Sequence, residues 1–208
     1  AMKIDLKKEF KALYSAPSTA PVFVDVPALT YLMIDGAGDP NMAQGYADAV
    51  QALFSISYGA KFLVKKSEVA VDYGVLPLEG LWWAEDMAAF SQNDRGNWKW
   101  TVMIMQPEYV TPEILELARQ KAEKKLGRAL SEVRLEVLEE GRSAQILHLG
   151  PYAEEAPTIA ALHAFIEDHS ASLSGKHHEI YLSDPRRTKP ERLKTIIRQP
   201  VARAGNSG

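Results

Sequence analysis

The sequence predicts an α+β fold in which a strand–helix–strand–strand unit occurs twice, as two antiparallel half-sheets with a ligand cleft at the pseudo-two-fold. Three observations support this prediction. The 208 residues have an ordinary globular composition, 46% hydrophobic and 25% charged. Strand-like and helix-like periodicities alternate along the chain. The order of elements in the first half recurs in the second, and the halves close on Gln106-Pro107 and Gln199-Pro200.

The first half, residues 21–110, predicts a strand, a helix and two further strands in that order. A run rich in β-forming residues at 29–35 ends at a glycine turn. Apolar or small residues then recur every three or four positions across 46–64, as on one face of a helix. An extended stretch at 69–83 is broken by glycine and proline. The run at 98–105, Trp-Lys-Trp-Thr-Val-Met-Ile-Met, predicts the strand that closes this half.

A connector helix over 111–127 follows. Thr111 is a candidate N-cap, Pro112 occupies the first helical position, and Gly127 suits the C-terminal end. Glutamates near its start and lysines near its end match the sign of the helix dipole. These signals make it the clearest helix of the sequence.

The second half, residues 130–202, repeats the order of the first. A strand at 144–149 stops at a glycine turn, and a helix follows. One face of this helix carries Ile159, Leu162, Ile166 and His169. Strands at 177–182 and 195–198 complete the half, so we interpret the chain as an internal duplication.

An N-terminal arm, residues 1–20, precedes the domain, which we place at 21–202. The polar, weakly periodic start of the arm predicts a short amphipathic helix or a segment packed onto the domain.

Two similar halves can pair their sheets and leave a groove, and clefts between such units are favoured ligand sites.

Composition and charge exclude several classes of function. The net charge is −3 and the chain has no cysteine, so disulfides, thiolate catalysis and Cys-ligated zinc are excluded. The absence of cysteine fits a reducing compartment, and we expect a cytoplasmic protein. Apolar runs are too short for a membrane-spanning helix, so we expect no membrane association.

The end of the chain, residues 186–203, is basic although the chain as a whole is acidic. A patch that binds RNA or DNA is one interpretation. No nucleic-acid-binding motif accompanies it, so we favour a solvated loop and an edge strand, and expect no direct nucleic-acid partner.

Cofactor motifs are absent. Gly36 and Gly38 follow a strand, but the third glycine of a dinucleotide-binding loop is missing, and these two are more simply turn residues. There is no P-loop, no nucleophile elbow and no His-Glu-x-x-His. We therefore expect no cofactor.

The run His177-His178-Glu179 invites a metal interpretation. Neighbouring residues of a strand point to opposite faces, so the two histidines do not bind one ion together. His177 and Glu179 share a face, but no spacing signature supplies a third ligand. We expect no metal, and place His177 at the surface and His178 at an edge or in the core.

The same alternation of side chains along the strand places Glu179 and Tyr181 together on the face opposite Ile180 and Leu182. A carboxylate beside a phenol forms either a solvated surface or the polar floor of a cleft. The duplication favours the cleft, because it builds a groove over one sheet face.

Tryptophans occur in two close pairs. Trp98 and Trp100 lie on one strand face and suit the core. Trp82 and Trp83 are adjacent and point to opposite faces of a strand, so one of them is a candidate aromatic wall. Aromatic walls with a carboxylate floor suit planar, apolar, often cationic ligands.

Tyr152 and Glu155 stand in the turn before the second predicted helix. Acidic residues at a helix start are ordinary partners of the helix dipole. The alternative is a role in ligand binding, since this turn is expected at the mouth of the cleft.

Several segments resemble the GyrI-like small-molecule-binding domains. The runs 175–185 (Gly-Lys-His-His-Glu-Ile-Tyr-Leu-Ser-Asp-Pro) and 195–200 (Thr-Ile-Ile-Arg-Gln-Pro) resemble the end of such domains. The runs 78–84, 98–107 and 148–155 resemble a stand-alone branch of that family. The Glu-x-Tyr-Leu-Ser-Asp-Pro run is the most specific part.

The resemblance spans roughly residues 20–202 and implies a duplicated strand–helix–strand–strand fold. It implies that Glu179 is the pocket carboxylate, that Trp82 or Trp83, Tyr152 and Tyr181 form aromatic walls, and, by position, that Glu155 lies nearby. Similar proteins are effector domains that bind lipophilic cations, gyrase antagonists, or hydrolases of cyclopropane-bearing alkylating compounds. The first domain strand begins near residue 22, so we expect a stand-alone domain.

Three functions remain open. The first is a binding module or sink for a small planar aromatic ligand. The second is a hydrolase in which Glu179 acts as general base on water while Tyr181 or Tyr152 donates to the carbonyl that gains charge. The third is a protein-partner module. The natural ligand and the oligomeric state do not follow from the sequence.

Overall fold

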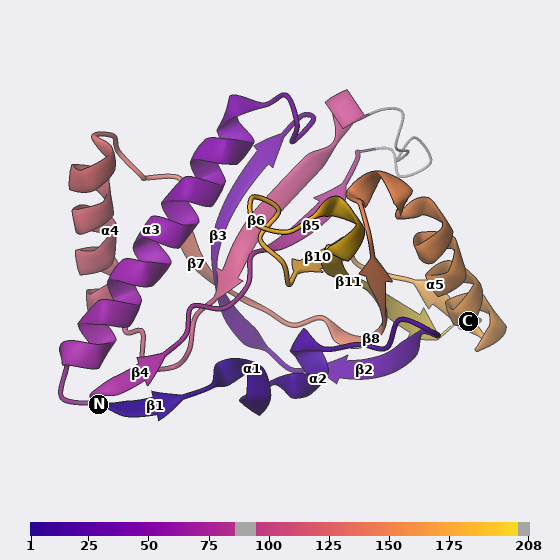
Figure 1. Ribbon diagram of the computed structural model, residues 1–208, viewed down its shortest axis with the longest axis horizontal. Helices are drawn as coiled ribbons and strands as arrows, with labels where there is room; N and C mark the ends of the chain where they lie inside the picture. Colours follow the sequence, from indigo (N-terminus) through magenta and orange to yellow (C-terminus); the bar gives the residue numbers. More distant parts are fainter. Residues whose placement is uncertain (86–94, 204–208) are drawn as a thin grey trace. The chain divides into compact units, whose positions relative to one another are not determined.

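The computed structural model describes residues 1–85 and 95–203 (Figure 1). The chain divides into two compact units. Unit 1 consists of Ala1–Glu9, Leu29–Leu78 and Trp82–Leu138. Unit 2 consists of Phe10–Ala28, Glu79–Leu81 and the chain from Glu139 to its end. Strand β5 (Glu79–Trp83) contributes its first three residues to unit 2 and its last two to unit 1.

The sheet of unit 1 is built around β3 (Leu29–Ala37). This strand pairs antiparallel with β6 (Lys99–Met105) on one side and with β7 (Arg134–Leu138) on the other. Both β3 and β6 carry near-continuous apolar runs, as expected for strands that are covered on both faces. Trp82 and Trp83 of β5 continue the order next to β6.

Two helices complete the core of unit 1. Helix α3 (Gln44–Lys66) buries the periodic face that the sequence predicts, and packs against β3, β6 and α4 (Pro112–Leu126). Gly59 of α3 faces Ala118 of α4, and a Cβ at residue 59 would make ordinary van der Waals contact with Ala118 at 3.5 Å. A three-residue 3₁₀ turn, η2 (Arg95–Asn97), precedes β6.

The first residues of the chain, predicted as an N-terminal arm, form regular secondary structure. Strand β1 (Met2–Ile4) pairs parallel with β4 (Val71–Tyr73) in a two-stranded sheet of unit 1. The short helices α1 (Leu6–Glu9) and α2 (Lys11–Tyr14) follow, the second belonging to unit 2. The predicted short helix is therefore two single turns.

The sheet of unit 2 has the order β2 (Val22–Val26), β8 (Gly141–Leu149), β11 (Lys194–Arg203), β10 (His177–Tyr181), with Glu79–Leu81 of β5 next to β10. The pairs β2–β8, β8–β11 and β10–β11 are antiparallel. A short strand, β9 (Ala171–Leu173), pairs with the end of β11. The expectation of an edge strand at 195–198 is wrong, because β11 lies between β8 and β10.

Helix α5 (Ala156–Asp168) covers one face of this sheet. Its apolar side packs on β8 and β11 in a core of Ala144, Ile146, Leu162, Ile166 and Ile197. Two 3₁₀ turns flank these elements, η3 (Tyr152–Glu154) before α5 and η4 (Pro190–Arg192) before β11.

The predicted α+β duplication is confirmed by the strand order within each unit. The elements β3, α3, β5, β6 correspond to β8, α5, β10, β11. In each set the first strand pairs with the last, and the third strand lies beyond the last. Such a repeated order is the signature of an internal repeat.

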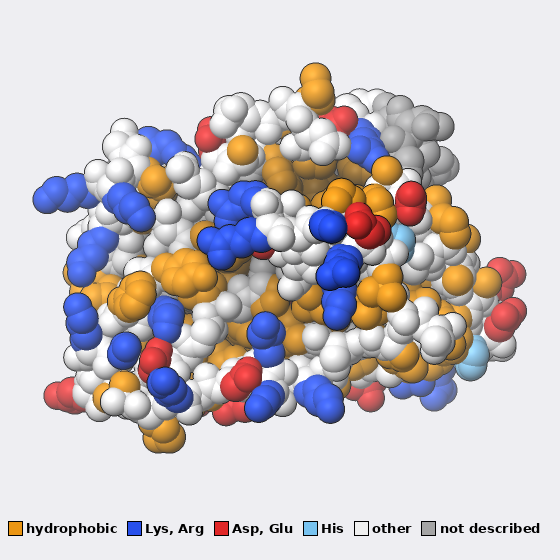
Figure 2. All heavy atoms as spheres, in the orientation of Figure 1, with side chains coloured by type: hydrophobic (Ala, Val, Ile, Leu, Met, Phe, Trp, Pro, Cys, Tyr) orange, Lys and Arg blue, Asp and Glu red, His pale blue; other side chains and the backbone are white. Residues whose placement is uncertain are grey.

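Basic side chains are spread across the face drawn in Figure 2, with acidic side chains among them. Within the described ranges, none of the helices combines the length and hydropathy that a membrane crossing requires.

Candidate functional site

The candidate site lies in unit 2, on the face of β10 that carries His177, Glu179 and Tyr181. Glu179 is only 9% exposed and Tyr181 is half-buried, so this face is no solvated surface. His177 is also buried, at 7% exposure, and the expectation that it lies at the surface is wrong. A hydrogen-bonded imidazole can be buried at little cost, which residue type alone does not reveal.

A short hydrogen bond joins the first two of these residues. His177 Nε2 donates to Glu179 Oε2 at 2.6 Å. Burial raises the pKa of Glu179, but the hydrogen bond and charge of His177, followed by hydrogen bonds from Glu155 and Tyr181, outweigh burial and lower this pKa below its usual value. Glu179 is therefore an ionised carboxylate inside the protein.

Glu155 approaches Glu179 from the start of α5. It is 3% exposed and occupies the N-cap position of the helix. The turn before it needs Gly150, whose φ of +117° is unfavourable for other residues. His148 fixes the same turn, because its Nε2 donates to the carbonyl oxygen of Pro151 at 3.0 Å and its Nδ1 lies 2.8 Å from the Thr158 hydroxyl.

Tyr152 and Tyr181 form an aromatic pair beside the carboxylates. Their ring centroids are 5.8 Å apart and the rings are nearly perpendicular, a favourable edge-to-face geometry. Burial, and then the negative charges of Glu155, Glu179 and Asp184, raise the pKa of Tyr152 to about 12. Tyr152 therefore remains a neutral phenol that can donate a hydrogen bond.

Two further polar residues near this face were not predicted. Thr195 is opposite Tyr181 on β11 and is 1% exposed, and its hydroxyl has no hydrogen-bond partner among the described residues. His163 lies on α5, and burial together with the charge of His177 lowers its pKa. His163 belongs to no motif singled out above. Thr195 opens the 195–200 run, but the cross-strand register that places it opposite Tyr181 is not visible in the sequence.

The opposite face of β10 holds a buried ionic network. His178 is fully buried, with Nε2 2.8 Å from Glu79 Oε1 and Nδ1 2.8 Å from Glu140 Oε1. Because carboxylate oxygens accept, both ring nitrogens donate and the ring is an imidazolium. Burial lowers the pKa of His178, but the charges and hydrogen bonds of Glu140 and Glu79 outweigh burial and raise this pKa to about 9.

The network continues into the first residues of unit 2. Arg198, 1% exposed, lies 3.8 Å from Glu140 and donates to the carbonyl oxygen of Leu13 at 2.7 Å. Tyr14 donates its hydroxyl to Glu79 at 3.1 Å. The solvated position expected for Arg198 is therefore wrong. Because Arg198 is buried in this network, the face of β10 opposite Glu179 is polar but not accessible to solvent.

The tryptophans lie in unit 1, and three of them, Trp82, Trp98 and Trp100, cluster with Tyr46. The Trp82 ring lies 5.9 Å from Tyr46 in a tilted arrangement and edge-on to Trp98 at 5.8 Å, and Trp100 lies edge-on to Tyr46. Trp98 and Trp100 are buried, which confirms the prediction for this pair. Trp82 is 5% exposed and Trp83 is half-buried. An aromatic wall at Trp82 or Trp83 stays a prediction.

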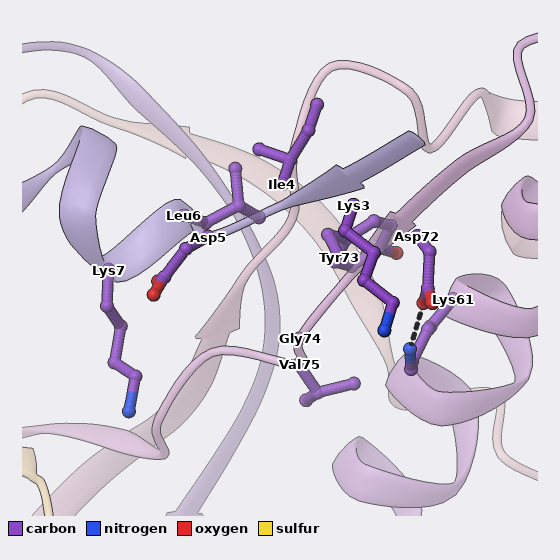
Figure 3. A pocket seen from close by; sticks show the side chains of 10 residues that line it. All are labelled: Lys3, Ile4, Asp5, Leu6, Lys7, Lys61, Asp72, Tyr73, Gly74 and Val75. Carbon is purple, nitrogen blue, oxygen red and sulfur yellow. Dashed lines mark hydrogen bonds and ion pairs between the residues drawn. The ribbon is translucent and has the colours of Figure 1, made fainter. Parts of the chain in front are cut away.

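A separate pocket of about 490 Å³ lies in unit 1 between β1, β4 and α3. Figure 3 shows Lys3 reaching toward the Lys61–Asp72 ion pair, while Asp5 and Lys7 lie on the other side. None of the site residues predicted from the sequence lines it. In the described parts of the chain, no group of three His, Asp or Glu side chains is arranged to hold a metal ion.

Comparison with protein families gives one match that covers most of the chain. The family model described as a GyrI-like small molecule binding domain matches residues 19–202. No curated protein matches the chain.

Solved structures show the same relationship. An uncharacterized conserved protein from Listeria innocua is 44% identical, with a TM-score of 0.87, over 96% of this chain and all of that chain. Two structures of hydrolases from Listeria innocua are 41% and 43% identical, with TM-scores of 0.83 and 0.85 and the same coverage. The C-terminal domain of EcmrR is similar in fold, with 12% identity and a TM-score of 0.55, over 88% of this chain and 98% of that domain.

Proposed function

Because the chain belongs to the GyrI-like family of small-molecule-binding domains, we propose that it binds planar, lipophilic, often cationic aromatic compounds. The observation that carries this proposal is Glu179, a buried carboxylate that its neighbours keep ionised. Tyr152 and Tyr181 supply aromatic surface next to it.

The physical reason lies in the cost of burying charge. An ionised carboxylate removed from water is stabilised by an opposite charge, and the attraction grows as water is excluded. A cation whose charge is spread over aromatic rings loses less hydration than a compact ammonium ion. Its flat faces also contact tyrosine rings, which adds roughly 0.5–2 kcal/mol per cation–π contact.

A fluorescence titration with ethidium, a planar permanent cation, tests the proposal. We expect saturable binding by the wild type and a loss of affinity of roughly tenfold or more in Glu179→Gln, since about 1.4 kcal/mol is a factor of ten. Glu154→Gln is the matched control, because Glu154 is an exposed carboxylate in the neighbouring turn. Equal affinity of wild type and Glu179→Gln would rule out the carboxylate as the cation's partner.

A second candidate function is hydrolysis of strained, electrophilic rings such as cyclopropanes conjugated to a carbonyl. Two relatives with more than 40% identity are described as hydrolases, and this observation favours it. Glu179 takes a proton from water as the water oxygen bonds to the ring carbon. The carbon–carbon bond of the ring breaks, its electrons reach the carbonyl oxygen, and Tyr181 or Tyr152 protonates that oxygen.

A mass-spectrometric time course separates the two functions. Wild type, Glu179→Gln and Tyr181→Phe are each mixed with an excess of a cyclopropane-bearing alkylating compound. Hydrolysis predicts that the compound gains one water over many turnovers, with a loss of about 10²-fold or more in Glu179→Gln. Stoichiometric binding without consumption of the compound leaves the binding function alone.

A further inference from the structure

We propose that two copies of this chain associate through β7, the strand that ends the sheet of unit 1. The two β7 strands pair antiparallel, with Arg134 of each copy opposite Glu136 of the other. The partner that this edge fits is therefore a second copy of the same chain. None of the residues involved belongs to the candidate site on β10, so the association is independent of the proposed ligand binding.

The outer side of β7 is an unpaired edge within the part of the chain that the structure describes. There β7 pairs with β3 alone, and the strand order ends at β7. An edge strand presents backbone N–H and C=O groups that readily pair with another extended segment. Proteins commonly protect such an edge with proline or lysine, but residues 134–138, Arg-Leu-Glu-Val-Leu, contain neither. The edge is thus competent for strand pairing.

The side chains of β7 form a charged face and an apolar face. Arg134 and Glu136 lie on one face and Leu135 and Val137 on the other, because neighbours alternate along a strand. Leu135 is half-buried, whereas Val137 is 62% exposed. Apolar surface is therefore left in water along the free edge, and covering it is favourable.

An apolar groove borders the same edge. It has a volume of about 190 Å³ and lies between α4 and the strands β3 and β7. Six of its eight lining residues are apolar, among them Leu115 of α4, Leu135 of β7 and Val133 just before β7. The other two, Glu116 and Arg119, are hydrogen-bonded to each other. An apolar side chain supplied from outside can pack at this groove without meeting an unpaired charge.

One register of the antiparallel pair satisfies both faces at once. A pair of identical antiparallel strands has two-fold symmetry, so each contact occurs twice. With Leu135 opposite Leu135 of the other copy, Arg134 lies opposite Glu136. Opposite charges directly across two strands stabilise a sheet. On the apolar face Val137 lies opposite Val133, so the exposed Val137 is covered beside the groove that Val133 lines.

The neighbouring registers are disfavoured by charge. Centring the pair on Glu136 places two glutamates opposite each other, and centring it on Arg134 places two arginines opposite each other. In the second case Glu132 also lies opposite Glu136. Like charges directly across two strands are destabilising. The order of charges along β7 therefore selects the register centred on Leu135.

Sedimentation velocity of the wild type over a range of protein concentrations tests the association. A strand of five residues gives a small interface. We therefore expect a reversible monomer–dimer equilibrium with a Kd on the order of micromolar rather than a permanent dimer. A wild type that stays monomeric at every concentration would overturn the proposal and leave the edge to an extended segment of another protein.

Charge reversal tests the register. Arg134→Glu makes both charged positions of β7 negative, and Glu136→Arg makes both positive, so each variant sets like charges opposite each other twice. We expect each variant alone to raise the Kd roughly tenfold or more. An equimolar mixture of the two variants should recover the dimer, because a negative edge then pairs with a positive one.

Each failure of this second experiment has a distinct meaning. If both variants dimerise as well as the wild type, the interface lies elsewhere and the proposal is wrong. If both variants are weakened but their mixture does not recover, the register centred on Leu135 is wrong.

A variant on the apolar face keeps the test decisive, because Arg134 also binds Asp35 of its own chain at 2.9 Å and Arg134→Glu removes that ion pair. Val137→Lys alters an exposed residue and sets a charge beside the apolar groove of the other copy, so it should weaken the dimer roughly tenfold or more. Val69→Lys is the matched control, at another exposed valine of unit 1, and should dimerise like the wild type. Equal Kd values for the two lysine variants would overturn the proposal.

Discussion

His178 is the residue whose charge the fold of unit 2 fixes most firmly. It donates from both ring nitrogens, to Glu79 and Glu140, in a region with no exposure to solvent. Removing one partner of such a buried ionic group leaves an uncompensated charge, which costs about 3–5 kcal/mol. The network thus constrains β10, whose next residue is Glu179.

This arrangement predicts how stability depends on pH. The pKa of His178 is raised from 6.5 to about 9 in the folded protein. Its contribution to the free energy of unfolding is therefore complete below about pH 6.5 and is lost as pH rises through about 9, with a total of up to about 3 kcal/mol. An NMR titration of the histidine ring signals should show one ring that stays protonated to about pH 9. Five rings that all lose their proton below pH 7.5 would contradict this charge assignment.

The alternation of side chains along a strand correctly placed Glu179 and Tyr181 on one face of β10. It could not identify the residues from other parts of the chain that contact this strand. The partners of His178 are 38 and 99 residues away in the chain, so no local pattern reports them. The burial of His177 likewise depends on its bond to Glu179 rather than on its own polarity. Charged residues in a strand are assigned to solvent by default, and tertiary pairing overrides that assignment.

Helix α4 shows, at the scale of an element, how completely local signals can define a boundary. The Thr111 hydroxyl accepts from the backbone N–H of Ile114 at 3.2 Å, Pro112 opens the helix, and Gly127 ends it at a φ of +70°. These are the residues that the sequence singles out. Each satisfies a steric or hydrogen-bonding need of a helix end.

Removal of this cap should destabilise unit 1 measurably. Thr111→Ala deletes the hydroxyl that accepts from Ile114, with an expected loss of about 1 kcal/mol in the free energy of unfolding. Thr111→Ser keeps the hydroxyl and should stay near the wild type. Chemical denaturation of the three proteins measures the difference. A Thr111→Ser protein as unstable as Thr111→Ala would point to the lost methyl group instead.

The pairing of the shortest strands is what the sequence does not predict, although β4 lies in the extended stretch expected at 69–83. Strands β1 and β4 have three residues each, and their parallel pairing joins segments almost 70 positions apart, with Lys3 opposite Asp72. Strand β7 has five residues and alternates charged and apolar side chains only over the first four, 134–137. Long periodic elements such as α3 carry enough repeats to be recognised, whereas short strands depend on their partners.

At the scale of the whole molecule, unit 2 is assembled from three separate stretches of chain. The first stretch is held by side chains from β8 and β11. Gln145 donates to the carbonyl oxygens of Ala12 and Ser15, and Arg198 donates to that of Leu13. The segment that precedes the matched family region is therefore bound into the core of this unit.

Two truncations test the role of this segment. Deletion of residues 1–15 removes the carbonyl acceptors of buried Arg198 and Gln145, and should cost roughly 3 kcal/mol. Deletion of residues 1–9 is the matched control, because it leaves Leu13 and Tyr14 in place. In thermal unfolding we expect the longer deletion to lower the Tm by roughly 6–12 °C more than the shorter one. Equal Tm values would show that the segment contributes nothing beyond its first nine residues.

The bond between Arg198 and Leu13 spans 185 positions of the chain. During synthesis, which proceeds from the N-terminus at roughly 5–20 residues per second, Leu13 waits many seconds before Arg198 has been made. Unit 2 therefore cannot close until its last strand, β11, has emerged from the ribosome. Contacts of such long range also slow folding, so the closing of this unit comes late in the assembly of each molecule.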